Sequence, residues 1–317
     1  MAYIGGMIDL RQLRALTAVA REGSVSRAAL RLGWSQPTVD YHLKNLDRIV
    51  GTPLLVRSTR GSALTSAGTL MVERAAEILS LTERAVTDTQ ELANLGRVRV
   101  RFGIFPTAAA RLLPDIVTRL ALVGVELDAS LEEVTPLVTG VNRRELDAAL
   151  VYAAGGYQLP FRSEVHTTPV LSEPLLLVLP RGHRFAEQEH ISHEDLLSLA
   201  GDPWVLGATA GDTMDDAVRD VFLAAGLELN VAMRSDDFSV VQGLVAAGMV
   251  IGLVPELALV TQREDIVAKP IVGQSFTREI VLAAPGEGPG KQPPAAVRQL
   301  AEAIRRSVSA TRIDRAS

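Results

Sequence analysis

Two glycines ten residues apart constrain the N-terminal fold most strongly, because each follows a short helical pattern and favours its end. Residues 10–20 carry apolar side chains at helical spacing, and Gly23 follows them. Residues 27–32 form a second short pattern, which Gly33 ends. Ser35 can cap a third helix. The spacing predicts three short helices with a tight turn between the second and the third, the outline of a helix-turn-helix.

The third predicted helix has one apolar face and one polar face. The apolar stripe consists of Val39, Leu43, Leu46 and Val50. It is about 40° wide and is expected to pack inward. The polar face consists of Tyr41, Lys44, Asn45 and Arg48. Gln36 and Thr38 lie in the first turn with Pro37, in the part of a recognition helix that reaches base edges. A solvated polar face has the same pattern, so this helix alone does not establish DNA binding.

A short hairpin is predicted after the third helix. Following Gly51, the sequence TPLLVRSTRGSALTSAG gives an apolar strand, a polar tip at residues 57–61 and a returning strand. Arg57 and Arg60 are placed for phosphates or for a minor groove, where the negative potential is concentrated. A hairpin in this position is typical of the wing beside a helix-turn-helix.

Charge separates the head of the chain from its body. Residues 1–65 hold nine Lys and Arg against four acidic residues, a net charge of +5, and the remainder carries −10. A basic head on an acidic body favours a polyanion meeting the head alone. The chain has no cysteine, which excludes disulfides and thiolate chemistry and favours a reducing, cytoplasmic setting.

A long helix is predicted from residue 65 to residue 95, a stretch without proline. Its apolar positions are Leu70, Ala75, Ile78, Leu79, Ala85, Val86, Leu92 and Ala93. Pairing with a second copy of the chain would cover this stripe, and packing against the body of the same chain is the alternative. A pair of heads would meet two DNA half-sites about one helical turn apart or a multiple of it.

From residue 97 the sequence alternates strand-like runs with amphipathic helical stretches. This order predicts an α/β fold with a parallel sheet and helices on both faces. A second set of the same kind begins near residue 175, and residues 276–308 return to the first set. Two lobes are therefore expected, lobe one at 97–168 and 276–317 and lobe two at 169–275.

Residues 7–75 resemble the DNA-binding head of LysR-type transcriptional regulators, in IDLRQLRALTAVAREGSVSRAALRLGWSQPTVDYHLKNL and GTPLLVRSTRGSALTSAG. The body resembles the effector domain of that family, itself similar to periplasmic binding proteins, in LLPDIVTRL, ELDAALVY, EPLLLVLPRGHRFA and LVAAGMVIGLVPE. The family pattern begins at Met7, which is therefore expected to be the natural start.

The resemblance implies a ligand-responsive transcriptional regulator that binds double-stranded DNA and a small-molecule effector. The expected domains are a winged helix-turn-helix at 1–64, a linker and dimerisation helix at 65–96 and an effector-binding domain at 97–317. A homodimer is expected through the linker helix, and the resemblance points further, to a homotetramer.

Several residues take DNA-binding roles from the resemblance. Gln36, Pro37 and Thr38 match the helix start that contacts bases and backbone in the family, and Arg57 matches its wing arginine. The sequence departs at Asp40 and Tyr41, where Ser followed by Arg is common. Asp40 can accept from a cytosine amine or brace Lys44, and Tyr41 can donate to a phosphate. The DNA-binding candidates are Ser35, Gln36, Pro37, Thr38, Asp40, Tyr41, Lys44, Arg57 and Arg60.

In such a two-lobed fold the ligand lies between the lobes, at strand carboxyl ends and helix N-termini. The effector-binding candidates are Phe105, Thr107, Ala108, Tyr152, Ala208, Thr209, Asp236 and Phe238. A helix N-terminus after Thr107 favours a carboxylate. The acidic residues Asp212, Asp215, Asp216, Asp236 and Asp237 instead favour a cationic or zwitterionic ligand. The sequence leaves both open.

Signals for other classes of protein are weak. His190 and His193 have ligand-like spacing but no third ligand, so no metal and no cofactor is expected. No nucleophile elbow or P-loop occurs, which argues against an enzyme. Residues 243–260 are almost uncharged, but are predicted to form helix, turn, strand and helix rather than a membrane span. The alternative function is a two-lobed solute-binding sensor whose basic head contacts a protein.

Overall fold

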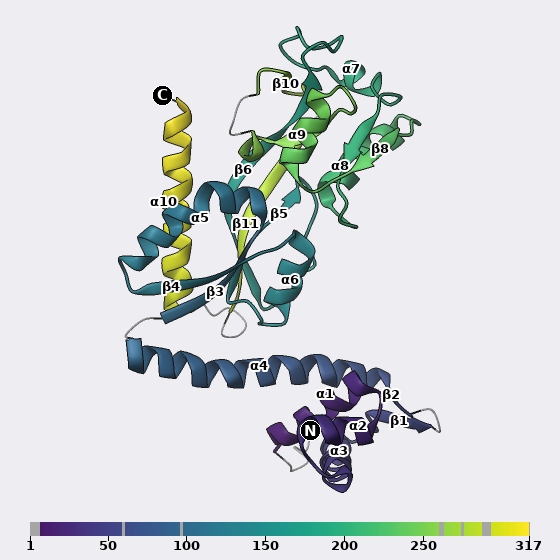
Figure 1. Ribbon diagram of the computed structural model, residues 1–317, viewed down its shortest axis with the longest axis vertical. Helices are drawn as coiled ribbons and strands as arrows, with labels where there is room; N and C mark the ends of the chain where they lie inside the picture. The colour runs from purple at the N-terminus through teal and green to yellow at the C-terminus, as the bar shows by residue number, and fades with distance from the viewer. Residues whose placement is uncertain are drawn as a thin grey trace. The chain divides into compact units, whose positions relative to one another are not determined.

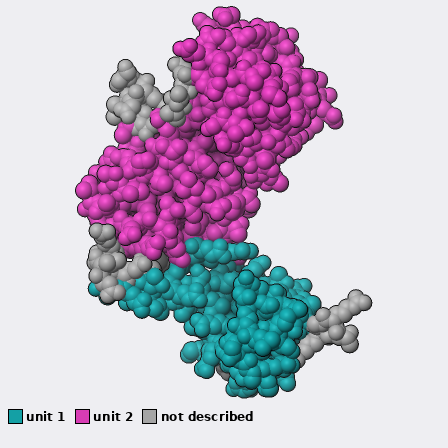
Figure 2. Space-filling view, viewed as in Figure 1, with its two compact units in different colours: residues 1–96, 143–145 teal, residues 97–142, 146–317 magenta. Residues whose placement is uncertain are grey.

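The computed structural model describes residues 7–58, 61–95, 98–259, 263–273, 276–286 and 293–316. The chain divides into two compact units, one of residues 1–96 with 143–145 and one of residues 97–142 with 146–317 (Figure 2). The first unit contains the head and the long helix, and the second contains both lobes of the body.

Three helices form the head: α1 (Leu10–Glu22), α2 (Val25–Leu32) and α3 (Gln36–Val50) (Figure 1). Gly23 and Gly33 follow α1 and α2 with φ angles of 64° and 67°, in the left-handed region where a side chain is strained. The predicted helix-turn-helix is confirmed, although α2 begins two residues before its predicted start.

The apolar stripe of α3 forms part of the head core, with one exception. Val39, Leu43 and Leu46 are at most 4% exposed, but Val50 is 39% exposed. The prediction for Val50 was wrong because this residue ends the helix, beyond the reach of the core. His42, which was not predicted to be part of the core, is buried, and its ring centroid lies 5.3 Å from that of Trp34.

The wing is the antiparallel hairpin of β1 (Leu55–Ser58) and β2 (Gly61–Leu64). It is joined to α3 by a hydrogen bond in which the Leu54 N–H donates to the Asp47 carboxylate over 3.0 Å. A second backbone bond closes the hairpin where the Thr65 N–H donates to the Leu54 carbonyl over 3.0 Å. The first of these contacts fixes the base of the wing to α3.

The long helix α4 (Ser66–Leu95) is capped by the preceding Thr65, whose hydroxyl accepts from the Gly68 N–H over 3.0 Å. One face of its first half packs on the head core. This face consists of Ala67, Met71, Val72, Ala75 and Leu79. The linker helix is thus integral to the head at its N-terminal end.

Lobe one is built on the strands β3 (Val98–Ile104), β4 (Val125–Leu131), β5 (Ala148–Ala154) and β11 (Thr277–Pro285). β3 runs parallel to β4 and β5, whereas β11 runs antiparallel to β5. The expected parallel sheet is therefore mixed. The reason is that β11 returns to lobe one from lobe two and enters the sheet in the opposite direction.

Helices cover the lobe-one sheet on both faces, as predicted. α5 (Pro106–Ala121) lies beside α10 (Ala295–Ala316), and α6 (Val134–Asn142) packs on β5 and β11 on the other face (Figure 1). The core between them is aliphatic and aromatic, with Phe102 and Ile116 fully buried.

The strand β6 (Val165–Pro180) belongs to both lobes. Its residues 165–174 pair with β11 in lobe one. Its residues 175–180 pair in lobe two with β9 (Gly252–Pro255) and β10 (Ile266–Lys269). One continuous strand therefore carries the sheet from one lobe into the other.

The rest of lobe two comprises short elements around two small cores. β7 (Trp204–Leu206) is parallel to β8 (Val231–Arg234); α8 (Thr213–Ala224) packs on Trp204 in one core, and α9 (Phe238–Ala246) packs on Val205 in the other. Residues 243–260 contain the end of α9, a turn, β9 and the single-turn helix η1 (Glu256–Ala258). Among the described residues, no helix is long and apolar enough to cross a membrane.

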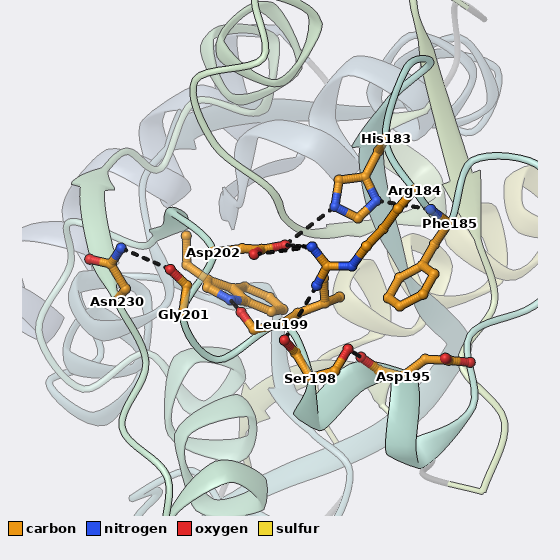
Figure 3. A network of polar contacts seen from close by, with 10 residues as sticks. His183, Arg184, Phe185, Asp195, Ser198, Leu199, Gly201, Asp202 and Asn230 are labelled. Atoms are coloured by element: carbon orange, nitrogen blue, oxygen red, sulfur yellow. Dashed lines mark hydrogen bonds and ion pairs between the residues drawn. The ribbon is translucent and has the colours of Figure 1, made fainter.

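A polar network ties the loops around α7 (His193–Leu197) together (Figure 3). The Asp202 carboxylate lies 3.2 Å from Arg184 Nη1 and 3.3 Å from His183 Nε2. The indole N–H of Trp204 donates to the Leu199 carbonyl over 2.8 Å. His183 and Arg184 belong to the segment EPLLLVLPRGHRFA that resembles the family. In the structure these two residues hold the loops of lobe two together.

Gly103→Ala is expected to destabilise the body by about 1–3 kcal/mol. An added Cβ would lie 2.4 Å from Leu137 Cδ2 and 2.7 Å from Leu146 Cδ1. The matched control is Gly243→Ala on α9, where an added Cβ meets nothing within 4 Å and helix propensity improves by up to about 1 kcal/mol. Urea unfolding followed by circular dichroism measures both. Equal effects of the two substitutions would contradict the packing described around β3.

Candidate DNA interface and effector cleft

The first turn of α3 is exposed and held by hydrogen bonds within the head. Ser35 caps the helix, since its hydroxyl accepts from the Thr38 N–H over 3.2 Å and lies 2.7 Å from the Thr38 hydroxyl. Gln36 Oε1 accepts from the Ser26 hydroxyl over 2.9 Å. Pro37 is exposed between them. The side chains predicted to meet DNA are thus oriented before any ligand arrives.

Further along α3, the polar face has a buried support. Tyr41 is 63% exposed and meets His42 edge-on, with ring centroids 5.5 Å apart. Lys44 is exposed one turn from Asp40, which is half-buried on the flank of the same face. The sequence analysis did not predict that His42 is buried and contacts both Trp34 and Tyr41. The only signal in the sequence was its position next to the apolar stripe of α3.

Two of the residues predicted to contact DNA, Arg57 and Arg60, belong to the wing. Arg57 pairs with Ser62 in the register of the hairpin, but its side chain lies outside the described residues. Arg60 also lies outside them. Their expected contacts with phosphates remain predictions.

A cavity of about 50 Å³ lies between the two lobes of the body. It shares Pro106, Thr107, Glu133, Asp236 and Phe238 with a wider cleft of about 770 Å³. A space of 50 Å³ holds roughly two water molecules. A ligand of ordinary size must therefore place one end in the small cavity and the rest in the wider cleft.

Five of the eight predicted effector residues line the cavity. These are Phe105, Thr107, Tyr152, Asp236 and Phe238. Ala108 is fully buried in the lobe-one core instead. Ala208 and Thr209 do not line it, but their N–H groups donate to the Asp236 carboxylate over 2.7 and 3.3 Å and so orient this wall residue.

A buried ion pair that sequence reasoning missed stands in the cavity wall. Arg278 of β11 and Glu173 of β6 are 0% and 2% exposed, and Arg278 Nε donates to Glu173 Oε1 over 2.8 Å. Arg278 Nη2 also donates to the Thr107 hydroxyl over 3.1 Å, and the Leu257 N–H donates to Glu173 Oε2 over 2.7 Å. The signal for this pair was the one glutamate of β6 and the one arginine of β11, each close to a run of apolar residues.

The guanidinium of Arg278 is also packed between two aromatic rings. It lies 4.9 Å from the ring centroid of Phe105 and 4.8 Å from that of Tyr152. Such cation–π contacts stabilise a desolvated cation. Its Nη1 is buried without a hydrogen-bond partner among the described residues.

Four carboxylates face the same cavity. Asp212 caps α8 through the Met214 N–H and lies 3.3 Å from the Tyr152 hydroxyl. Asp215 accepts from the Gly207 N–H over 3.0 Å. Glu133 and Asp236 complete the set. Among the described residues, no group of three or more His, Asp or Glu side chains is arranged to hold a metal ion.

Burial and mutual repulsion raise the pKa values of three of these acids. Burial raises the pKa of Asp215 to about 6, and it also raises the pKa of Asp212. The pKa of Glu133 is raised by burial first and then by the charges of Asp236 and Asp212. The cavity is therefore strongly acidic and incompletely solvated, a state that a cationic group would relieve.

A winged helix-turn-helix head and a two-lobed body with an inter-lobe cleft define a one-component regulator, which senses a ligand and binds DNA in a single chain. Residues 10–69 match the family described as bacterial regulatory helix-turn-helix protein, lysR family. Residues 93–309 match the LysR substrate binding domain. The chain belongs to the LysR family of ligand-responsive transcriptional regulators.

Its relatives align along most of their length. The HTH-type transcriptional regulator ClcR of Pseudomonas putida is 30% identical, over 85% of this chain and 90% of that protein. The dual regulator OxyR of Escherichia coli is 29% identical, over 94% and 95%. A solved structure of full-length CbnR with its target DNA has 25% identity and a TM-score of 0.62, and covers 94% of this chain and 99% of that one.

Stability is expected to depend on pH through Asp215. The folded protein binds this proton more tightly than the unfolded chain, so its stabilising effect is present below about pH 4 and is lost as the pH rises through 6. Asp215→Asn cannot ionise and can still accept from Gly207. Its free energy of unfolding should rise relative to wild type by about 1–3 kcal/mol between pH 4 and pH 7.

Denaturant unfolding across this pH range measures the difference. Glu133→Gln provides a second comparison and should change in the same direction, because the pKa of Glu133 is also raised. A difference that shrinks with rising pH would show that Asp215 is stabilised as a carboxylate in the folded protein.

Proposed function

We propose that this regulator reads double-stranded DNA with the exposed first turn of α3 and the wing. The observation that carries the proposal is the braced, outward-facing start of α3, where Gln36 and Thr38 are oriented by their neighbours. Gln36, Thr38 and Tyr41 would contact bases or the groove, with Asp40 at their flank. Ser35, Pro37, Lys44, Arg57 and Arg60 would contact or line the phosphate backbone.

Asp40 and Tyr41 stand where Ser followed by Arg is common in the family, and this difference bears on which base sequence the helix would recognise. A carboxylate accepts from the cytosine N4 amine, and a tyrosine hydroxyl donates to phosphate. Tyr41 is supported by the buried His42, which limits the directions in which it can point. We infer that this pair changes base preference rather than preventing DNA binding.

The proposed domains are the head at 1–64, the linker helix at 65–96 and the effector domain at 97–317. We propose that a small molecule binds between the lobes and changes their closure, and that closure changes how paired heads lie on DNA. The ligand can act only through a difference in affinity between two arrangements. Catalysis forms no part of this proposal, and a cytoplasmic location follows from meeting DNA.

Pairing of chains through α4 completes the proposal. Leu70, Ile78 and Leu81 are 41–56% exposed on α4. At about 100° per residue they lie within an arc of roughly 80°, and the face that packs on the head core lies to one side of this arc except at Ala67, where the two overlap. An exposed apolar stripe of this kind is covered when two helices pair. A tetramer would need further contacts between effector domains.

Base and phosphate contacts are separated by two substitutions. Gln36→Ala should weaken binding to the preferred site by about 1–3 kcal/mol with an unchanged salt slope. Lys44→Ala should weaken binding to all sequences and lower the slope by about one. The site is first selected from random duplexes, and binding is then titrated against salt concentration.

Ser26→Ala is the matched control for Gln36, because it removes the 2.9 Å bond to Gln36 and leaves the amide in place. It should have a smaller effect than Gln36→Ala. If no DNA sequence is enriched and any DNA binding is independent of salt concentration, the result would instead favour a solute-binding sensor whose head contacts a protein.

Leu81→Glu should dissociate the dimer by placing a charge within the apolar stripe of α4. Thr87→Glu is the control, since Thr87 is exposed and lies about 120° from Leu81 around the helix. Light scattering after size exclusion gives the mass of each variant. A Leu81→Glu protein that stays dimeric would move the interface elsewhere.

A further inference from the structure

Arg278, in the lobe-one wall of the cavity, has one nitrogen without a hydrogen-bond partner among the described residues. Two nitrogens of Arg278 are occupied by Glu173 and Thr107, but Nη1 is buried without a partner among the described residues. Leaving a buried charged donor unsatisfied is costly. An acceptor on a bound ligand would satisfy it.

Two neighbouring groups favour the same kind of ligand atom. The Thr107 hydroxyl accepts from Arg278, so its own proton remains available to donate. Thr107 also lies in the first turn of α5, whose N-cap Phe105 makes no side-chain capping bond. A helix N-terminus of this kind favours negative charge. Together these groups form a site for a carboxylate.

Carboxylates from both lobes line the rest of the cavity. Glu133 of lobe one and Asp212 and Asp236 of lobe two form no ion pair within the described part of the chain. Arg234 lies 3.7 Å from Asp215 and so balances that carboxylate only. The N-terminus of α8 is already capped by Asp212, which removes it as an anion site. A cationic group fits here.

The aromatic rings narrow the choice of cation. Phe105 and Tyr152 turn their faces to Arg278, so they do not form a cage for a quaternary ammonium. A primary ammonium has three N–H donors and can serve several carboxylates at once. The 50 Å³ of the cavity fits the polar end of such a ligand, with the remainder in the 770 Å³ cleft.

We propose that the effector is a small zwitterion of the α-amino acid class. Its carboxylate would accept from Arg278 Nη1 and the Thr107 hydroxyl, and its ammonium would donate to Glu133, Asp212 and Asp236. This proposal rests on the proposed function, because it assigns a ligand class to the cleft that the regulator would use as a sensor. The ligand bridges the lobes, since the anion site and Asp236 belong to different ones.

The common L-amino acids, at millimolar concentration, are the probes for the full-length protein. Thermal shift identifies binders, and calorimetry gives the Kd of each. For the tightest binder, the matching α-hydroxy acid and the decarboxylated amine are compared. Each should bind at least about tenfold more weakly, because each leaves one pole of the site unsatisfied.

Variants test which residues meet which pole. Asp236→Asn should weaken the amino acid at least about tenfold and leave the α-hydroxy acid nearly unchanged, because Asn still accepts the loop N–H groups. Thr107→Val should weaken the amino acid more than the amine. Thr107→Val and Asp236→Asn spare the Arg278–Glu173 ion pair, whose loss endangers folding. Asp220→Asn, on the part of α8 that meets Tyr157, is the control and should change the Kd by less than about twofold.

Operator binding without ligand is measured on the same preparations. If DNA binding persists while only amine-free carboxylates, only carboxylate-free amines or no amino acid bind, the ligand class is overturned and the regulator stands. If no DNA is bound, the proposed function itself fails. Equal weakening of the amino acid and its hydroxy acid by Asp236→Asn would also overturn the assignment of the ammonium.

Discussion

The ion pair between Arg278 and Glu173 holds the centre of the effector domain together. It joins β11 to β6, the strand that belongs to both lobes, and reaches α5 through Thr107 and η1 through Leu257. Desolvating both charges is expensive, and the pair is tolerated because nearly every polar atom is satisfied and two rings cover the guanidinium. The position of the cavity wall follows from this pair.

The head could be predicted from sequence because its signals are local. Helical periodicity, Gly23, Gly33 and the Ser35 cap each depend on neighbours within a few residues. The error at Val50 arose because periodicity gives the direction of a side chain but not where the core ends. His42 was missed for the complementary reason, since an imidazole is buried only when partners such as Trp34 are brought to it.

The cleft could be predicted only in part, because its walls come from distant segments. Helix starts and strand ends placed Phe105, Thr107 and Tyr152 at the cavity by a general rule of α/β folds. No local pattern indicates that Arg278 meets a carboxylate 105 positions away. The antiparallel entry of β11 and the passage of β6 through both lobes are equally non-local, so the sequence predicted the parallel strands β3, β4 and β5 but not the antiparallel strand beside them.

The chain has two tryptophans, and their positions give each unit its own optical reporter. Trp34 contacts His42 beneath the side of the head that is proposed to face DNA. Trp204 is fully buried in lobe two, next to Val205 and Leu206 of the cavity wall. A change in emission on adding DNA or a ligand can therefore be assigned to one unit after the other indole is replaced by phenylalanine. Intrinsic fluorescence therefore measures, without an added label, whether ligand binding in the cleft changes the surroundings of Trp34 in the head.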